Sequence, residues 1–136
     1  MSSLPIIFHD IEAVAGDYLR AALSARGNPQ PVQTTHPGDT VRSYVRVEVT
    51  GGGRTSLTMD AANLVFECYS DDSYAASQLA ALVRALVQSM DRLEGRPVIY
   101  GVSEISRPQS MTDPETGVTF YTQTHQIRYR GYSLDA

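Results

Sequence analysis

The chain has 136 residues, a mass of 14.9 kDa and a formal net charge of −4 at pH 7. This length is typical of one domain with one hydrophobic core, so we expect residues 1–136 to form a single domain. The acidic balance disfavours binding along a nucleic-acid backbone, and no apolar run approaches the roughly 20 residues that span a bilayer. The N-terminal segment is acidic rather than basic, which predicts a chain without a signal peptide that stays in the cytoplasm where it is made.

The first predicted element is a helix that begins after Asp10. Apolar residues recur at spacings of three and four from Ile11 to Leu23, which places them on one helical face. The Asp10 carboxylate is suited to accept the free backbone N–H groups of the first turn. Gly27 and the prolines that follow it end the helix.

Two strands and a hairpin turn are predicted next. Residues 32–36 are a short strand candidate, and from Tyr44 onward the sequence alternates, with three valines on one face. Tyr44, Arg46 and Glu48 then lie on the opposite, outward face. The triple glycine 51–53 predicts a hairpin turn, and a phosphate-binding loop is excluded because such loops need a lysine and the chain has none.

A predicted strand over residues 63–69 runs into a long helix, whose apolar stripe begins at Tyr74 and extends over about five turns. The strand end and the turn carry Cys68, Asp71 and Asp72. A nucleophile elbow needs a glycine-flanked Ser or Cys, and this turn contains no glycine. We therefore interpret the two aspartates as the cap and first turn of the helix, and Cys68 as a buried thiol.

The last third of the chain predicts a strand over residues 98–105, a long polar connection over 107–117 and an unusually long final strand over 118–132. The segment TQTHQIRYR is polar on both faces, which favours a strand that meets another subunit or protrudes into solvent. Tyrosines in this strand are typical either of interfaces or of the edge of a core.

Together these elements predict an α+β fold, in which an antiparallel or mixed β-sheet packs on two α-helices and a long C-terminal β-hairpin follows. The three histidines lie far apart in the sequence, and none has a partner at the spacing of metal ligands. We expect a protein that is not an enzyme and that holds no metal or cofactor.

Four segments resemble the tail terminator, or tail completion, proteins of long-tailed phages and prophages. They are IIFHDIEAVAGDYLRAAL, SYVRVEVTGGG, DAANLVFECYSDDSYAASQLAALVRAL and QIRYRGY, and the likeness spans residues 6–132. The resemblance implies a subunit that forms a six-membered ring, caps the tail tube, stops tail polymerisation and offers a surface to the head-completion protein. It also implies a place at the head-proximal end of the virion tail after assembly in the host cytoplasm, with DNA passing through the lumen without specific binding and no contact with a membrane.

The family supplies no catalytic residue to carry over, so the expected functional residues are contacts between subunits. They are Tyr44, Arg46, Glu48, Arg107, Met111, Asp113, Arg128 and Arg130. Two alternatives stay open. One is a head-completion or connector protein of the same particle, and the other is a small cytoplasmic enzyme or ligand-binding domain that uses Cys68 or His125.

Overall fold

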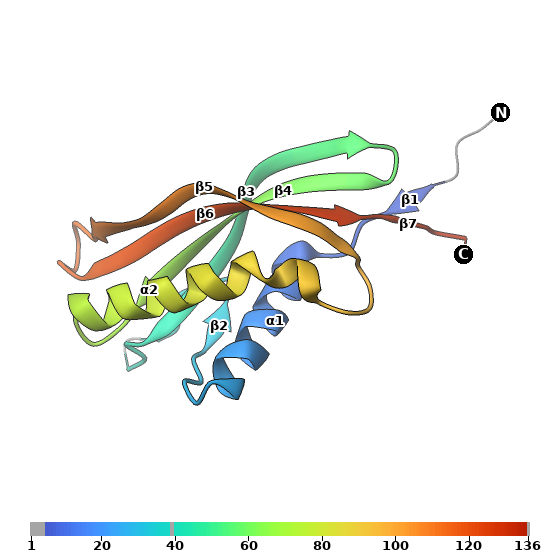
Figure 1. The fold of residues 1–136 in the computed structure, drawn as a ribbon. Helices are drawn as coiled ribbons and strands as arrows, with labels where there is room; N and C mark the ends of the chain where they lie inside the picture. Colours follow the sequence, from blue (N-terminus) through green and yellow to red (C-terminus); the bar gives the residue numbers. More distant parts are fainter. Residues whose placement is uncertain (1–4, 39, 136) are drawn as a thin grey trace.

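The computed structural model describes residues 5–38 and 40–135. Two helices lie on one face of a five-stranded sheet, and a second sheet of two short strands extends from one end of it (Figure 1). The elements are β1 (Ile6–Ile7), α1 (Ile11–Ala25), β2 (Val32–Gln33), β3 (Tyr44–Ser56), β4 (Met59–Tyr69), α2 (Ser73–Gln88), the 3₁₀ helix η1 (Met90–Arg92), β5 (Ile99–Thr112), β6 (Thr119–Arg130) and β7 (Tyr132–Ser133). The predicted α+β class with a long C-terminal hairpin is confirmed.

The large sheet has the strand order β2-β3-β4-β6-β5, with β2 parallel to β3 and the other neighbours antiparallel. The final long strand, β6, is therefore an inner strand that covers the core, and the prediction that it meets another subunit or protrudes into solvent instead is wrong. Its polar residues are accommodated in the core, because the Gln123 side chain donates to the Ala80 carbonyl of α2 at 3.0 Å and its Oε1 lies 2.8 Å from His125 Nε2. Both side chains are buried.

The hydrophobic core fills the space between the two helices and the sheet. As the alternation predicts, Val45 and Val47 of β3 point into it, and so do Leu64, Phe66 and Cys68 of β4. The helices contribute the apolar stripes that their spacing predicts. Their buried apolar residues are Ile11, Ala15, Leu19 and Leu23 of α1, and Ala76, Leu79, Ala80, Val83, Leu86 and Val87 of α2.

Both helices begin at the predicted aspartates. The Asp10 carboxylate accepts hydrogen bonds from the backbone N–H groups of Glu12 and Ala13, and the Asp72 carboxylate accepts one from Ala75 at 2.7 Å. Asp71 precedes the cap and lies outside α2. α2 is shorter than predicted, because the chain tightens into η1 after Gln88.

Replacing Asp72 by alanine is expected to lower the free energy of unfolding by about 1 kcal/mol, because the Ala75 N–H loses its acceptor. Asp71→Ala removes the same charge one residue earlier without removing the cap, and it is the matched control. Urea unfolding followed by circular dichroism measures both. Equal effects of the two substitutions would contradict the assignment of Asp72 as the cap.

The triple glycine is not the hairpin turn, which corrects the prediction. Residues 51–53 lie inside β3 and pair with residues 61–63 of β4, while the chain turns at residues 57–58. A register shift bends β3 here, and Gly52 has a φ of 106°. A Cβ at Gly52 would overlap the Ala61 carbonyl oxygen, so this bulged part of the strand requires glycine.

Two other predicted boundaries change. The connection predicted over residues 107–117 is largely strand, since β5 continues to Thr112 and only residues 113–118 turn into β6. Pro108 lies in a register shift on this outer strand, where a missing N–H is tolerated. The strand predicted over residues 32–36 shortens to Val32–Gln33.

Candidate assembly surface

The face of the large sheet opposite α1 and α2 carries no helix among the described residues (Figure 1). Successive side chains of a strand point to opposite faces of the sheet, and cross-strand partners point to the same face. The strand register therefore defines which residues lie on the face opposite the helices. We call it the open face. Its principal residues are Tyr44, Arg46 and Glu48 of β3, Asn63, Val65, Glu67 and Tyr69 of β4, Phe120, Thr122, Thr124, Gln126, Arg128 and Arg130 of β6, and Ser103 and Met111 of β5.

One end of the open face carries a row of aromatic rings. Tyr44 stacks on Tyr69 with ring centroids 4.5 Å apart, and Tyr69 stacks on Phe120 at 4.7 Å. His36 packs edge-on against both tyrosines, and its Nδ1 lies 2.9 Å from the Tyr44 hydroxyl. The two tyrosines are only 7% and 8% exposed. Because the rings lie face to face within the chain, they do not form a free stacking platform for bases.

An ion-pair network lies next to this row. Arg46 Nε lies 2.7 Å from Glu67 Oε1, and Arg46 Nη1 lies 3.0 Å from Glu48 Oε2. The hydrogen bond to Glu67 raises the pKa of the Arg46 guanidinium, and burial together with Glu67 raises the pKa of the Tyr69 hydroxyl. Arg46 is thus held within the chain, whereas the Glu48 side chain keeps about half of its surface exposed.

The other end of the open face presents two arginines whose hydrogen-bond partners are neutral. Arg128 Nη1 donates to Ser103 Oγ at 2.8 Å, and Arg130 Nη1 donates to the Tyr100 hydroxyl at 3.1 Å. Arg128 crosses β5 at Gly101, where a Cβ would overlap its guanidinium. Among the described residues, neither arginine forms an ion pair with a carboxylate.

The remaining predicted contact residues lie on β5 and the turn that follows. Met111 is 49% exposed and pairs with Phe120, so it extends the aromatic row to the outer strand. Arg107 is exposed in the register shift of β5. Asp113 opens the turn, and its Oδ1 accepts a hydrogen bond from Glu115 N at 2.8 Å. The fold thus places every predicted contact residue except Arg107 and Asp113 on the open face.

The two edges of the large sheet differ in how they are protected. On the β3 side, β2 pairs with the start of the strand, and Glu12 of α1 accepts a hydrogen bond from the Val49 N–H at 2.8 Å. On the β5 side, no strand within residues 5–38 and 40–135 pairs with the outer edge, and Ile105 is 57% exposed. An unpaired edge is a template for another chain, so this edge adds to the candidate surface.

Cys68 and His125, the residues of the enzyme alternative, are both fully buried. Burial raises the pKa of the Cys68 thiol and lowers the pKa of His125, which leaves both groups neutral at pH 7. Gln123 uses its amide N–H for the Ala80 carbonyl, so its oxygen accepts a hydrogen bond from the Nε2–H of His125. Nδ1 of His125 finds no partner in the described part of the chain. Neither a thiolate nor an accessible base is present at this place.

Cys68 is expected to react slowly with a thiol reagent in the folded protein and rapidly after denaturation, because a buried neutral thiol is a poor nucleophile. The rate of labelling by a chromogenic disulfide, with and without urea, measures this. Rapid labelling in native buffer would contradict the burial and favour the enzyme alternative.

The stability of the protein is expected to fall on acidification. The imidazole of His125 titrates near a pKa of about 6.5 in the unfolded chain, whereas burial holds the folded-state pKa below that value. Between these two pKa values the unfolded state binds more protons, so the free energy of unfolding decreases as the pH falls through about 6.5 and towards the lower value. Urea unfolding at several pH values should show this slope for the wild type and for His9→Gln at an exposed site, but a smaller slope for His125→Gln.

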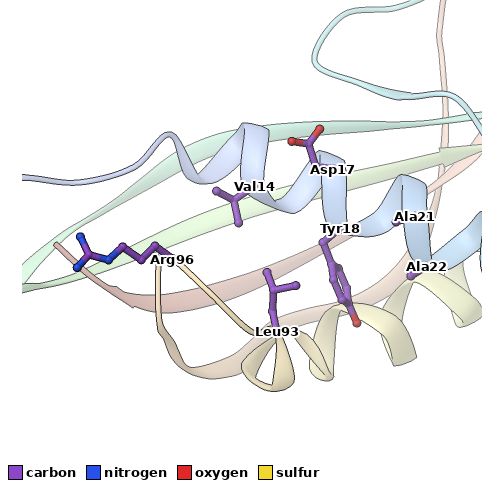
Figure 2. A pocket seen from close by; sticks show the side chains of 7 residues that line it. All are labelled: Val14, Asp17, Tyr18, Ala21, Ala22, Leu93 and Arg96. Carbon is purple, nitrogen blue, oxygen red and sulfur yellow. The ribbon is translucent and has the colours of Figure 1, made fainter. Parts of the chain in front are cut away.

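An apolar hollow lies between α1 and the segment that follows η1 (Figure 2). The residues that line it are Val14, Asp17, Tyr18, Ala21, Ala22, Leu93 and Arg96. The Tyr18 hydroxyl donates to the Leu86 carbonyl at 2.6 Å, and Asp17 points away from the hollow and pairs with Arg20. The hollow is largely open to solvent, which is unlike an active-site cleft that encloses its ligand.

Two further properties of the described residues bear on other classes of function. No group of three His, Cys, Asp or Glu side chains lies close enough together within them to hold a metal ion. None of the helices described is long and apolar enough to cross a membrane.

Comparison with known proteins relates this fold to that of a virion chain. No family model and no curated protein matches the sequence. A solved structure described as the virion of a native gene transfer agent particle contains a chain that is 18% identical to this one. The two structures superpose with a TM-score of 0.68 over 89% of this chain and 95% of that one. The protein therefore shares its fold, over nearly its whole length, with a chain of a gene transfer agent virion.

Proposed function

We propose that this protein is a structural component of a phage-like virion, and within that class a tail terminator. Its subunits form a ring of six on the finished tail tube, stop tail polymerisation and provide the surface for head joining. The observation that carries the virion assignment is the fold shared with a chain of a gene transfer agent virion over 89% of the sequence. The terminator role rests on the resemblance of the four sequence segments to that family.

The surface geometry supports a protein that works by contacts with other chains. Within the part of the chain that the structure describes, the large sheet has one face without a helix and an unpaired edge at β5. Apolar side chains are exposed at Tyr100, Ile105 and Met111. These are features of subunits that assemble with other chains. The buried polar residues Cys68 and His125 are part of the core rather than of a cleft.

The partners follow from this proposal. They are further copies of the chain, the tail tube protein, the head-completion protein, and DNA that passes through the ring. The net charge of −4 suits a channel that DNA crosses without being retained. The second candidate is a head-completion or connector protein of the same particle.

Deletion of the gene in the particle-producing host separates these two roles. A terminator is expected to leave tails of uncontrolled, increased length, because nothing stops tube growth. A connector is expected to leave tails of normal length that fail to join heads. Electron microscopy of the lysate measures both, and expression of the wild-type chain in trans is the control. Joined particles with tails of normal length would contradict the proposal.

A further inference from the structure

The large sheet carries charges of opposite sign at the two ends of its long strands. At one end Arg128 and Arg130 point from β6, held by Ser103 and Tyr100. At the other end the turn after β5 carries Asp113 and Glu115. We call these places the arginine end and the acidic tip.

The guanidinium groups of Arg128 and Arg130 are oriented to bind anions. Each is oriented by a neutral hydroxyl, so its remaining N–H groups stay available for a carboxylate partner. Gly101 provides the space in which the Arg128 guanidinium crosses β5. Orientation before binding reduces the entropy lost when a partner docks.

The acidic tip lies at the opposite end of the same sheet. β4 connects the two ends. Its first residue, Met59, pairs with Arg130 at the arginine end. Just after its last residue, Asp71 lines the same hollow as Asp113 at the acidic tip. The eleven residues of β4 at about 3.3 Å each separate the two ends by on the order of 35 Å. This distance exceeds the Debye length of about 8 Å at physiological salt, so the charges do not neutralise one another within one subunit.

Each end also presents apolar surface beside its charges. At the acidic tip Met111 and Val118 are 49% and 43% exposed. At the arginine end Val98 and Tyr100 are 42% and 45% exposed. An apolar centre with complementary charges at its rim is the usual composition of a protein interface, in which the charges set orientation and specificity.

We propose that adjacent subunits associate head to tail, with Arg128 and Arg130 of one copy bound to Asp113 and Glu115 of the next. The inference rests on the proposed function and names the contact that builds the ring. Because the two surfaces differ, the contact is heterologous, and repetition closes into a ring when the rotation between copies permits it. DNA is the less suitable anion, since the chain is acidic overall and the arginine end offers few phosphate contacts.

Charge reversal at each end tests the contact. We expect Arg128→Glu/Arg130→Glu and, separately, Asp113→Arg/Glu115→Arg to reduce self-association at least tenfold in sedimentation velocity, because like charges then meet at every interface. A mixture of the two variants should recover rings, since alternating copies restore opposite charges at all contacts. Arg26→Glu/Arg92→Glu makes the same change in net charge as Arg128→Glu/Arg130→Glu, on exposed residues away from the open face, and it should assemble like the wild type.

The outcomes separate this inference from the function on which it rests. Circular dichroism first establishes that each variant is folded, and recovery in the mixture shows that folding is not the cause of lost assembly. Wild-type rings together with undiminished rings of both reversed variants would overturn the head-to-tail contact and leave the function standing. A wild type that stays monomeric even on purified tail tubes would overturn both. Loss of binding to a duplex DNA oligonucleotide by Arg128→Glu/Arg130→Glu, with self-association unchanged, would assign the arginine end to DNA instead.

Discussion

Replacing Gly52 by alanine is expected to destabilise the protein by about 3 kcal/mol or more. There is no room for a Cβ at this position, and the positive φ of Gly52 is unfavourable for alanine. The added carbon would meet the backbone of Ala61 and Ala62, which β4 holds in place and which therefore cannot rotate away as a side chain would. Urea unfolding followed by circular dichroism gives the change in the free energy of unfolding.

Gly53→Ala is the matched control for this substitution. A Cβ on this neighbouring glycine would enter open space, and its φ is one that other residues adopt, so alanine there should change the stability by less than about 1 kcal/mol. A similar loss at both positions would show that the glycines matter only for the flexibility of the strand, and would contradict the bulge at Gly52.

Tyr69→Ala is expected to cost about 3 to 5 kcal/mol, the usual range for removing a buried aromatic ring. Tyr69 is the middle ring of the row, stacked on Tyr44 and on Phe120, so its loss opens a gap that neither neighbour can close. Thermal and urea unfolding measure the change.

Tyr74→Ala makes the same substitution on a side chain that is 74% exposed at the start of α2, and it should have little effect. A small effect of Tyr69→Ala would mean that the open face is not ordered by its aromatic row. In that case the aromatic rings would be free to contact a partner chain.

The elements that were predictable are those specified by local chemistry. Asp10 and Asp72 precede apolar stripes of helical spacing, and a capping carboxylate acts on N–H groups only two or three residues away. Val45 and Val47 alternate with polar residues, which indicates a strand with one buried face whatever its partners are.

The wrong predictions concern contacts between distant segments. Glycines 51–53 have the composition of a turn, but their pairing with β4 carries the strand past them. Pro108 and its polar neighbours have the composition of a loop, yet a register shift on the outer strand accommodates them. Gln123 and His125 are polar but hydrogen-bond inside the core, Gln123 to the Ala80 carbonyl and to His125 Nε2. No local pattern reports such partners.

The candidate surface was foreseen in part. Arg46 and Glu48 follow from the alternation of β3, whereas Glu67, which holds Arg46, required the register of β4. Tyr69 and Phe120 were missed as members of the aromatic row. The available signal was an aromatic residue near one end of each strand, Tyr69 in β4 and Phe120 in β6. Whether the two rings stack depends on β4 and β6 being neighbours in the sheet.

The most direct test of the proposed ring is the native mass of the purified wild-type protein, measured by light scattering over a concentration series in the presence and absence of isolated tail tubes. Negative-stain images of the same samples show the shape of the particles. The proposed function predicts closed six-membered rings with a central hole, free or seated on one end of the tubes. A protein that remains monomeric at every concentration, and that leaves the tube ends bare, would contradict it.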